Sequence, residues 1–232
     1  MSLDWVEDAK RRAAFEAVKN VKDGSVIGLG SGSTAAYAIK EIGRRVREEG
    51  LRLLGIPTSC QSFLLAVKVG IPITTLHEHP VIDLTIDGAD QIDPNLNLIK
   101  GMGGALTREK IVAAASKRLI IVADERKLTD KLGRGQPVPV EVLPFAEPLV
   151  SRKIEEIGGR PFLREVKGGA PYITDNGNFI LDVDFGVIEN PHEVNERLKR
   201  IPGVVETGLF LGMTHTAYIG TETTVKRIDK VT

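Results

Sequence analysis

The chain has 232 residues, of which 42% are hydrophobic and 27% are charged, and this balance excludes a disordered or fibrous protein. Lysine plus arginine and aspartate plus glutamate each total 31, so no overall charge draws the molecule to nucleic acid or an anionic membrane, and any anion site must be local. No apolar run reaches the roughly 18 residues that a membrane span needs. The single cysteine, Cys60, cannot form an internal disulfide, and residues 1–8 show neither a secretory nor a transit pattern, so we expect a cytoplasmic protein.

Helical and extended patterns alternate along the first part of the chain. Apolar spacing predicts, in order, a helix over Asp4–Val21, a strand over Ser25–Leu29, a helix over Thr34–Glu49, a strand over Leu51–Ile56, a helix over Gln61–Val69, a strand over Val81–Ile86, a short strand at Leu98–Ile99, a helix over Ala105–Ser116 and a strand over Leu119–Val122. This alternation is typical of βαβ units stacked around a mostly parallel sheet.

The composition changes near residues 133–137, after which prolines stand at 137, 139, 144 and 148. The following segments are a strand over Val138–Val142, a helix over Pro148–Ile157, strands over Phe162–Glu165 and Phe179–Val183, a helix over Pro191–Arg200 and a strand over Val204–Glu206. This order predicts a small α+β domain over residues 133–206. Residues 1–132 and 207–232 would form the larger domain, and the alternating segment Thr216–Ile228 predicts a strand that returns to its sheet.

A glycine-rich turn, Gly28-Leu29-Gly30-Ser31-Gly32-Ser33-Thr34, joins the first strand to the second helix. Backbone amides at a helix N-terminus, the helix dipole and three hydroxyls favour a phosphate there. A tight turn with a capping hydroxyl is the plainer alternative. A dinucleotide site fits poorly, because Ser33 replaces the third glycine and no acid follows the second strand, and the Walker pattern fails because no lysine follows the glycines.

Two carboxylates in Asp87-Gly88-Ala89-Asp90 directly follow an apolar strand. Ligands of open α/β sheets bind at the carboxyl edge of the strands, which makes these acids candidates for a site. An aspartate that caps the next turn is the alternative. Asp93, three residues further on, is expected to be solvated.

A second glycine-rich turn, Lys100-Gly101-Met102-Gly103-Gly104, leads into Ala105-Leu106-Thr107-Arg108-Glu109-Lys110. On a helical wheel Glu109 falls among Ala105, Leu106, Val112 and Ala113, so its face is otherwise apolar. Partial burial disfavours ionisation of a carboxyl group and raises its pKa, which suits a general base. A partly buried ion pair with Lys100 is the alternative.

Other candidates are weaker. His77 and His79 share one side of an extended segment, but no third ligand is near them, so we expect no metal. Cys60 has no adjacent base and is expected to be a buried or incidental thiol. Lys127, beyond the strand Leu119–Val122, could reach the same sheet edge, although alone it would be a solvent-facing lysine.

Together these loops supply a phosphate cradle, paired carboxylates, a lysine and a semi-buried glutamate, without a redox or metal motif. This combination suits proton transfer on a phosphorylated sugar. In these motifs, and in the later Gly208-Leu209-Phe210, the chain resembles the ribose-5-phosphate isomerase A family, cofactor-free cytoplasmic enzymes of the pentose phosphate pathway. The motifs occur in the family's order and cover nearly the whole chain. The resemblance implies a Rossmann-like domain with a second, smaller ferredoxin-like α+β domain, and a homodimer or homotetramer.

The resemblance also implies the site residues. Glu109 would be the base, with Asp87, Asp90 and Lys100 in the catalytic pocket. Substrate contacts would come from Ser31, Gly32, Ser33, Thr34, Gly88, Ala89, Gly101, Met102, Gly103 and Lys127. Met102 departs from the glycine that often stands in the family, which affects the expected loop shape more than the activity, because its backbone N–H is retained.

The implied reaction interconverts D-ribose 5-phosphate and D-ribulose 5-phosphate. Glu109 would move the proton between C2 and C1 through a cis-enediolate, with Lys100 and loop amides as donors to its oxygens. The division of roles between Asp87 and Asp90 stays open. Two other classes also remain: a sugar-phosphate-sensing module without turnover, which usually carries a DNA-binding segment not found here, and a different enzyme on a related fold, such as an amino-sugar phosphate deaminase or a CoA transferase.

Overall fold

The computed structural model of the protein describes residues 4–230. The chain divides into two compact units, the first comprising Met1–Ala89, Arg108–Lys127 and Met213–Thr232, and the second Asp90–Thr107 and Leu128–Gly212. Residues 1–3 and 231–232, which the predicted larger domain includes, lie outside the described residues. In the part of the chain that the structure describes, no helix is both long and apolar enough to cross a membrane.

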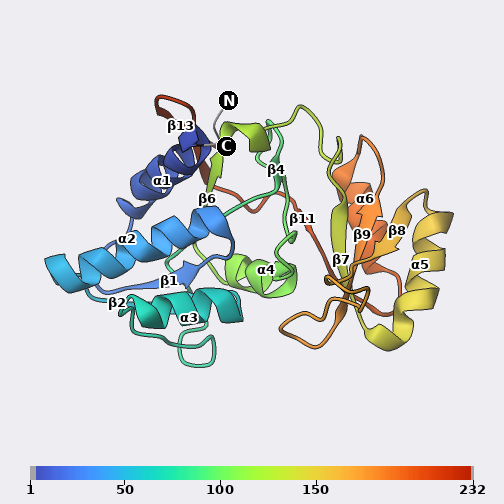
Figure 1. Cartoon of the computed structure of the whole chain (residues 1–232), viewed down its shortest axis with the longest axis horizontal. Coiled ribbons are helices and arrows are strands. Elements are labelled where there is room, and N and C mark those ends of the chain that lie inside the picture. The colour runs from blue at the N-terminus through green and yellow to red at the C-terminus, as the bar shows by residue number, and fades with distance from the viewer. Residues whose placement is uncertain (1–3, 231–232) are drawn as a thin grey trace. The chain divides into compact units, whose positions relative to one another are not determined.

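The first unit is built on a mostly parallel sheet, with strands in the order β13-β12-β6-β3-β1-β2 (Figure 1). Its strands are β1 (Ser25–Leu29), β2 (Leu53–Pro57), β3 (Leu84–Asp87), β6 (Leu119–Asp124), β12 (Thr216–Gly220) and β13 (Val225–Asp229). Its helices are α1 (Asp4–Val18), α2 (Ser33–Glu49), α3 (Cys60–Lys68) and α4 (Leu106–Ala114), the last of which starts in the second unit. Neighbouring strands are parallel except for β12 and β13, which are antiparallel. The predicted α/β fold with a mostly parallel sheet is confirmed.

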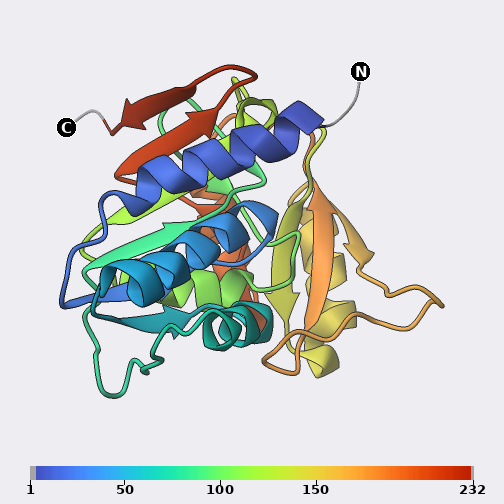
Figure 2. The ribbon, with the colours of Figure 1, turned by 60° about the vertical axis from the view of Figure 1, so that its left-hand side comes forward.

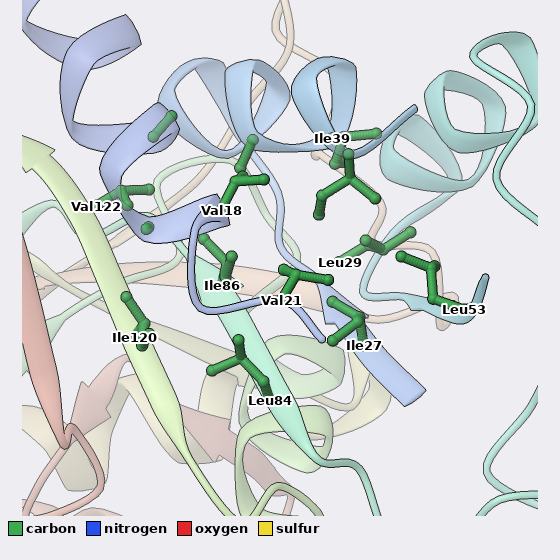
Figure 3. Close-up of a cluster of buried hydrophobic side chains, with 14 of the residues drawn as sticks. Val18, Val21, Ile27, Leu29, Ile39, Leu53, Leu84, Ile86, Ile120 and Val122 are labelled. Carbon is green, nitrogen blue, oxygen red and sulfur yellow. The ribbon is translucent and has the colours of Figure 1, made fainter. Parts of the chain in front are cut away.

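Alternate side chains of each strand point to opposite faces of this sheet, and apolar side chains pack on both faces. Ile27 and Leu29 of β1 belong to the larger apolar cluster together with residues of α1 and α2. Figure 3 shows this cluster, in which side chains of β1, β3 and β6 lie against Val18, Val21 and Ile39. On the other face, Val26 of β1 packs with Val112 of α4. Helices therefore cover both sides, as in doubly wound sheets.

The second unit contains a four-stranded antiparallel sheet in the order β10-β7-β9-β8. Its chain order is β7 (Val138–Val142), α5 (Glu147–Glu156), β8 (Arg160–Leu163), β9 (Phe179–Asp184), α6 (Pro191–Lys199) and β10 (Val204–Thr207), with a short 3-10 helix, η2 (Pro144–Ala146), before α5 (Figure 1). This βαββαβ order with the first and third strands central is the ferredoxin-like arrangement. The structure therefore confirms the predicted ferredoxin-like α+β fold of the second domain.

The two faces of the β7–β9 pair differ in character. Val138, Val140 and Val142 pack with Leu181 and Val183 against the apolar sides of α5 and α6. The alternate residues of the same strands include Glu141 and Asp182, which therefore lie on the face opposite to the helices.

A third sheet joins β4 (Gln91–Ile92), β5 (Leu98–Ile99) and β11 (Leu209–Phe210) within the second unit. This pairing places residues 90–107 in the second unit, whereas the sequence assigned them to the first domain. The unit limits near residues 128 and 212 also lie outside the predicted 133–206. The strand Leu98–Ile99 was predicted, but two residues carry too little periodicity to reveal which strands it pairs with.

The C-terminal segment was predicted as one strand over Thr216–Ile228. It forms two strands, β12 and β13, because Thr221 and Thr224 close a turn between them, in which the Thr221 N–H donates to the Thr224 carbonyl at 2.8 Å. The predicted return to the first sheet is correct, since β12 pairs with β6 (Figure 2). Alternation persists through a short hairpin, so periodicity alone could not reveal the turn.

Candidate active site

The first part of the site lies where the connections of the parallel sheet diverge. β1 lies between β2 and β3, so the chain continues to one side of β1 first and to its other side later. Ligands of such sheets bind in the crevice outside the strand ends at this switch point. The residues that follow β1 and β3 are the two motifs singled out in the sequence, the turn at 30–34 and the segment Asp87 to Ala89.

Asp87 joins the two motifs at this edge of the sheet. It ends β3, is 1% exposed, and its Oδ1 accepts hydrogen bonds from the N–H groups of Ser31 at 3.0 Å and Gly88 at 2.7 Å. Gly30 is required for this approach, since a Cβ there would lie 2.2 Å from Asp87 Oδ1. The aspartate therefore holds the phosphate-type turn against the end of β3, and the expected proximity of the two motifs is observed.

The Ser31 hydroxyl points to another group of hydroxyls. Its Oγ donates to Ser59 Oγ at 2.6 Å and lies 2.8 Å from Thr58 Oγ1. Ser59 is the N-cap of α3. Ser31 thus joins the first turn to the end of β3 through its amide and to the residues after β2 through its hydroxyl, so these contacts give it a structural role.

The N-terminus of α2 is better suited than the Ser31 hydroxyl group to bind an anion. Gly32 occupies its N-cap with φ 93°, has no side chain to cap the helix, and has open space where a Cβ would lie. Ser33 and Thr34 form the first turn of the helix. Lys10 of α1 donates from Nζ to Ser33 Oγ at 3.2 Å and to Glu7 at 2.8 Å, so a cation stands beside this helix terminus. Lys10 could not be predicted as a site residue, because it lies 23 residues before Ser33 in the sequence.

Glu109 lies in the first turn of α4 and is 5% exposed. The apolar neighbours that the helical wheel assigned to its face, Ala105, Leu106, Val112 and Ala113, are all buried. One turn further along the helix, Val112 packs against β1, where a Cβ on Gly28 would lie 2.6 Å from its side chain. Because helices in βαβ units run opposite to the strands, Glu109 stands towards the carboxyl edge of the sheet.

The end of β6 carries a third set of charges. Asp124 is 1% exposed and pairs with Arg126, whose Nε donates to Oδ1 at 2.7 Å. Burial raises the pKa of Asp124, but the hydrogen bonds from Arg126 outweigh burial and hold that pKa below its ordinary value. The pair shapes the 3-10 turn η1 (Glu125–Lys127), which places the half-buried Lys127 directly after β6.

Lys100 belongs to the second unit and is unusually buried for a lysine, at 3% exposure. It follows β5, its N–H donates to the Gly208 carbonyl at 2.9 Å, and its ammonium stands 5.3 Å from the Phe210 ring centroid. A Cβ on Gly208 would lie 2.3 Å from the Lys100 carbonyl oxygen. The Gly208-Leu209-Phe210 motif therefore serves to hold Lys100.

The loop after Lys100 is a tight turn that also holds Asp90. The Gly104 N–H donates to the Gly101 carbonyl at 2.9 Å, and both glycines have positive φ, 103° at Gly101 and 81° at Gly104. The Met102 N–H donates to Asp90 Oδ2 at 3.0 Å. The methionine thus retains the backbone donor that a glycine would provide, as predicted.

Several side chains named in the sequence have structural surroundings. Asp93 is buried rather than solvated, because its Oδ1 accepts the N–H groups of Asn95 and Asn97, each at 2.8 Å, in a turn. His79 Nδ1 contacts Thr74 Oγ1 at 2.8 Å. Within residues 4–230, no group of three or more histidine, cysteine, aspartate or glutamate side chains is arranged to hold a metal ion.

The predicted site residues therefore form two groups. Ser31, Gly32, Ser33, Thr34, Asp87, Gly88, Ala89, Glu109 and Lys127 belong to the first unit. Asp90, Lys100, Gly101, Met102 and Gly103 belong to the second. Hydrogen bonds join Ser31 and Gly88 to Asp87 in the first group and Met102 to Asp90 in the second. Together they contain carboxylates, an ammonium group and helix-terminal amides, which is the chemistry that proton transfer on a phosphorylated carbonyl compound requires.

Comparison with known proteins identifies the family. A sequence model of ribose 5-phosphate isomerase A (phosphoriboisomerase A) matches residues 54–224. The chain belongs to the ribose-5-phosphate isomerase A family. The ribose-5-phosphate isomerase A of Methanosarcina acetivorans is 56% identical over 212 residues, covering 91% of this chain and 89% of that protein. The corresponding protein of Methanothermobacter thermautotrophicus is 50% identical over 218 residues, covering 94% and 96%.

Solved structures agree with this assignment. Ribose 5-phosphate isomerase A from Methanocaldococcus jannaschii superposes with a TM-score of 0.93 at 46% identity, covering 97% of this chain and 99% of that chain. A D-ribose-5-phosphate isomerase in complex with phospho-erythronic acid gives a TM-score of 0.94 at 44% identity, with the same coverage. The family predicted from the motifs is confirmed, and with it the assignment of the chain as an isomerase.

Proposed function

We propose that this member of the ribose-5-phosphate isomerase A family interconverts D-ribose 5-phosphate and D-ribulose 5-phosphate by proton transfer at Glu109. The reaction follows from family membership, and the roles of individual residues are the proposal. The observation that carries these roles is a buried carboxylate in the first turn of α4, a helix whose Val112 packs against β1, the strand that leads into the phosphate-type turn.

In the open-chain aldose, C2 carries the acidic proton because the adjacent carbonyl group stabilises the charge left behind. Glu109 removes this proton, an enediolate forms across C1 and C2, the hydroxyl proton passes from O2 to O1, and the same carboxyl group returns the carbon-bound proton to C1. Every atom is conserved, so no co-substrate is needed. A positioned base of this kind contributes roughly 10²–10⁴-fold to the rate.

The enediolate oxygens need donors. Lys100 and the amides of residues 101–103 supply an ammonium group and backbone N–H groups on a loop that Gly208 and Asp90 hold in place. Loss of one such donor costs about 3–4 kcal/mol of transition-state stabilisation. The complex of a related isomerase with phospho-erythronic acid supports this role, because the carboxylate of a phosphorylated sugar acid has the planar shape and charge of an enediolate.

The aspartates act on the hydroxyl groups. Asp87 would assist ring opening and move a hydroxyl proton, and Asp90 would bind the sugar hydroxyls. Lys127, after β6, would be a further substrate contact, as would Gly88 and Ala89. The phosphate would bind at the amides of Gly32, Ser33 and Thr34, with Ser31 holding their turn.

Lys10 is expected to contribute to phosphate binding. Replacing Lys10 by methionine removes the cation that lies 3.2 Å from Ser33 Oγ and keeps most of the side-chain volume. A charge-assisted hydrogen bond contributes about 1.5–3 kcal/mol, so KM should rise roughly tenfold or more while kcat changes little. Lys19→Met is the matched control, since Lys19 also pairs with a glutamate three residues earlier on α1. Equal KM values for the two variants would contradict the assignment.

The function itself is tested with the whole protein in a coupled assay for ribulose 5-phosphate formed from ribose 5-phosphate, in the presence of a chelator. Turnover under these conditions establishes substrate, reaction and independence from a dissociable metal together. Binding of ribose 5-phosphate without turnover would indicate a sensing module instead. Release of ammonia from glucosamine 6-phosphate, or acyl-CoA exchange, would indicate the alternative enzymes.

Two further features remain proposals. A homodimer or homotetramer follows from the family resemblance, and a cytoplasmic location follows from the residue pattern and the kind of metabolic enzyme. Size-exclusion chromatography with light scattering tests the first of these, and localisation of the tagged protein in cells tests the second.

A further inference from the structure

We propose that Arg164 is a positioning residue for the reaction, which orients the peptide groups of the loop after Lys100. The inference rests on the proposed function, because it assigns a purpose to the amides of that loop. Arg164 follows β8 and is not part of any motif found in the sequence. Its side chain is 12% exposed.

Arg164 connects the helix-free face of the four-stranded sheet to the loop. Its guanidinium pairs with Asp182 of β9, with Nε 2.8 Å from Oδ2 and Nη2 2.5 Å from Oδ1. Its Nη1 donates to the carbonyl oxygens of Gly101 at 3.0 Å and Met102 at 3.1 Å. The two-point pairing with Asp182 fixes the plane of the guanidinium, and the rigid fork then fixes both carbonyl groups.

The backbone of Arg164 is itself held on both sides. Its N–H donates to the Ile180 carbonyl at 2.8 Å, and its own carbonyl accepts the Tyr172 N–H at 2.8 Å. The Tyr172 ring lies 5.9 Å from the guanidinium, and its hydroxyl donates to the Gly103 carbonyl at 3.4 Å. Three successive carbonyl groups, those of residues 101 to 103, are therefore directed towards Arg164 and Tyr172.

Directing these carbonyls also directs the amides. In a trans peptide group the C=O and the following N–H point in opposite directions. The Gly101 carbonyl shares its peptide group with the Met102 N–H, which accordingly reaches Asp90. The Met102 carbonyl shares its group with the Gly103 N–H, which must point away from the guanidinium. Arg164 thus sets the orientation of one amide that holds a predicted site aspartate and of a second that can donate to an enediolate.

The loop needs such an external support. Two of its residues are glycines in the positive-φ region, and Gly103 has open space around its Cβ position, so side-chain packing does little to fix it. Misplacement of a catalytic group by about 1 Å can cost roughly 10²-fold in rate. Because Arg164 contacts the loop and not the phosphate turn, its loss should affect kcat rather than substrate binding.

The test compares Arg164→Gln with Arg160→Gln. Arg160 is the matched control, since it also lies at β8 and pairs with a carboxylate of β9, Asp184, in a more exposed position. We expect Arg164→Gln to lower kcat about 10²-fold with KM within about threefold of wild type, and Arg160→Gln to leave both unchanged. The inhibition constant of phospho-erythronic acid should rise with the loss in kcat, while that of inorganic phosphate stays constant.

A kcat of Arg164→Gln within about threefold of wild type would overturn the inference, as would a parallel weakening of phosphate and phospho-erythronic acid. If this variant does not fold, Asp182→Asn provides the test. Arg164 then keeps its contacts with the carbonyl groups of the loop, and only its pairing with residue 182 is weakened. Asp182→Asn should lower kcat about tenfold, and an unchanged kcat would refute the proposal. An inactive wild type would instead refute the proposed function.

Discussion

Replacing Glu109 by glutamine should abolish nearly all turnover while the protein folds and binds substrate. The amide has the shape of the carboxyl group but cannot accept a proton from C2. The expected loss in kcat is roughly 10²–10⁴-fold, or about 3–5 kcal/mol in the activation barrier. KM should stay close to wild type, because the phosphate contacts come from other residues.

Initial rates by the coupled assay measure this effect, and exchange of the C2 proton with deuterated solvent, followed by NMR, measures the proton-transfer step directly. Glu147→Gln is the matched control, since Glu147 also lies in the first turn of a helix, α5. The control should keep wild-type rates. Retention of a tenth of wild-type turnover by Glu109→Gln would exclude Glu109 as the sole base.

Much of the fold could be predicted because its elements are long and amphipathic. The strand Ser25–Leu29 and the strand Val138–Val142 have the predicted limits, and α2 begins one residue before its prediction. The pairs β4–β5 and β5–β11 were not predicted, because each strand has only two residues and the second pair joins segments far apart in the sequence. The assignment of residues 90–107 to a unit depended on those pairs, so periodicity could not give the limits of the units.

The candidate site also contains residues that could be predicted from the sequence and residues that could not. Residues in contiguous motifs, such as the turn at 30–34 and Asp87, were found because glycines and strand ends mark them locally. Lys10 and Arg164 were missed, because each is an ordinary charged residue in its own segment and gains its role from a partner far along the chain. Asp93 shows the opposite error, since its turn buries a carboxylate that the sequence would leave in solvent. The assignments of Glu109, Asp87, Asp90 and Lys100 stay predictions until variants are measured.

Replacing Glu141 by leucine should destabilise the protein more than any other change considered for the second unit. Glu141 of β7 is fully buried and accepts four hydrogen bonds. Thr174, Asn176 and Asn178 donate to its Oε1 at 3.0, 3.0 and 2.8 Å, and Thr107 donates to its Oε2 at 2.5 Å. Leucine fills the volume but leaves these donors without their acceptor, and each buried donor so affected costs about 1–3 kcal/mol.

The expected loss is about 4 kcal/mol in the free energy of unfolding, or roughly 10 °C in Tm for a chain of this length. The variant Glu141→Gln tests whether the lost hydrogen bonds cause this loss of stability. Its amide oxygen can still accept the three bonds made at Oε1, and the Thr107 hydroxyl can rotate to accept from the amide nitrogen, so the loss should be only about 1 kcal/mol. Glu155→Leu, at an exposed position of α5, should change stability by less than about 0.5 kcal/mol. Thermal and urea unfolding provide both measurements, and equal losses for the leucine and glutamine variants at position 141 would refute this explanation.

The position of Glu141 also predicts an effect on catalysis. Thr107, which it holds, lies in the first turn of α4 two residues before Glu109, and Glu141 and Asp182 occupy the same helix-free face of the β7–β9 pair. One carboxylate of that face thus holds the start of the helix that carries the base, and the other holds Arg164 and the loop after Lys100. If both act in this way, Glu141→Leu should lower kcat even at temperatures where the variant is fully folded. A variant that is destabilised but keeps wild-type kcat under those conditions would confine Glu141 to a structural role.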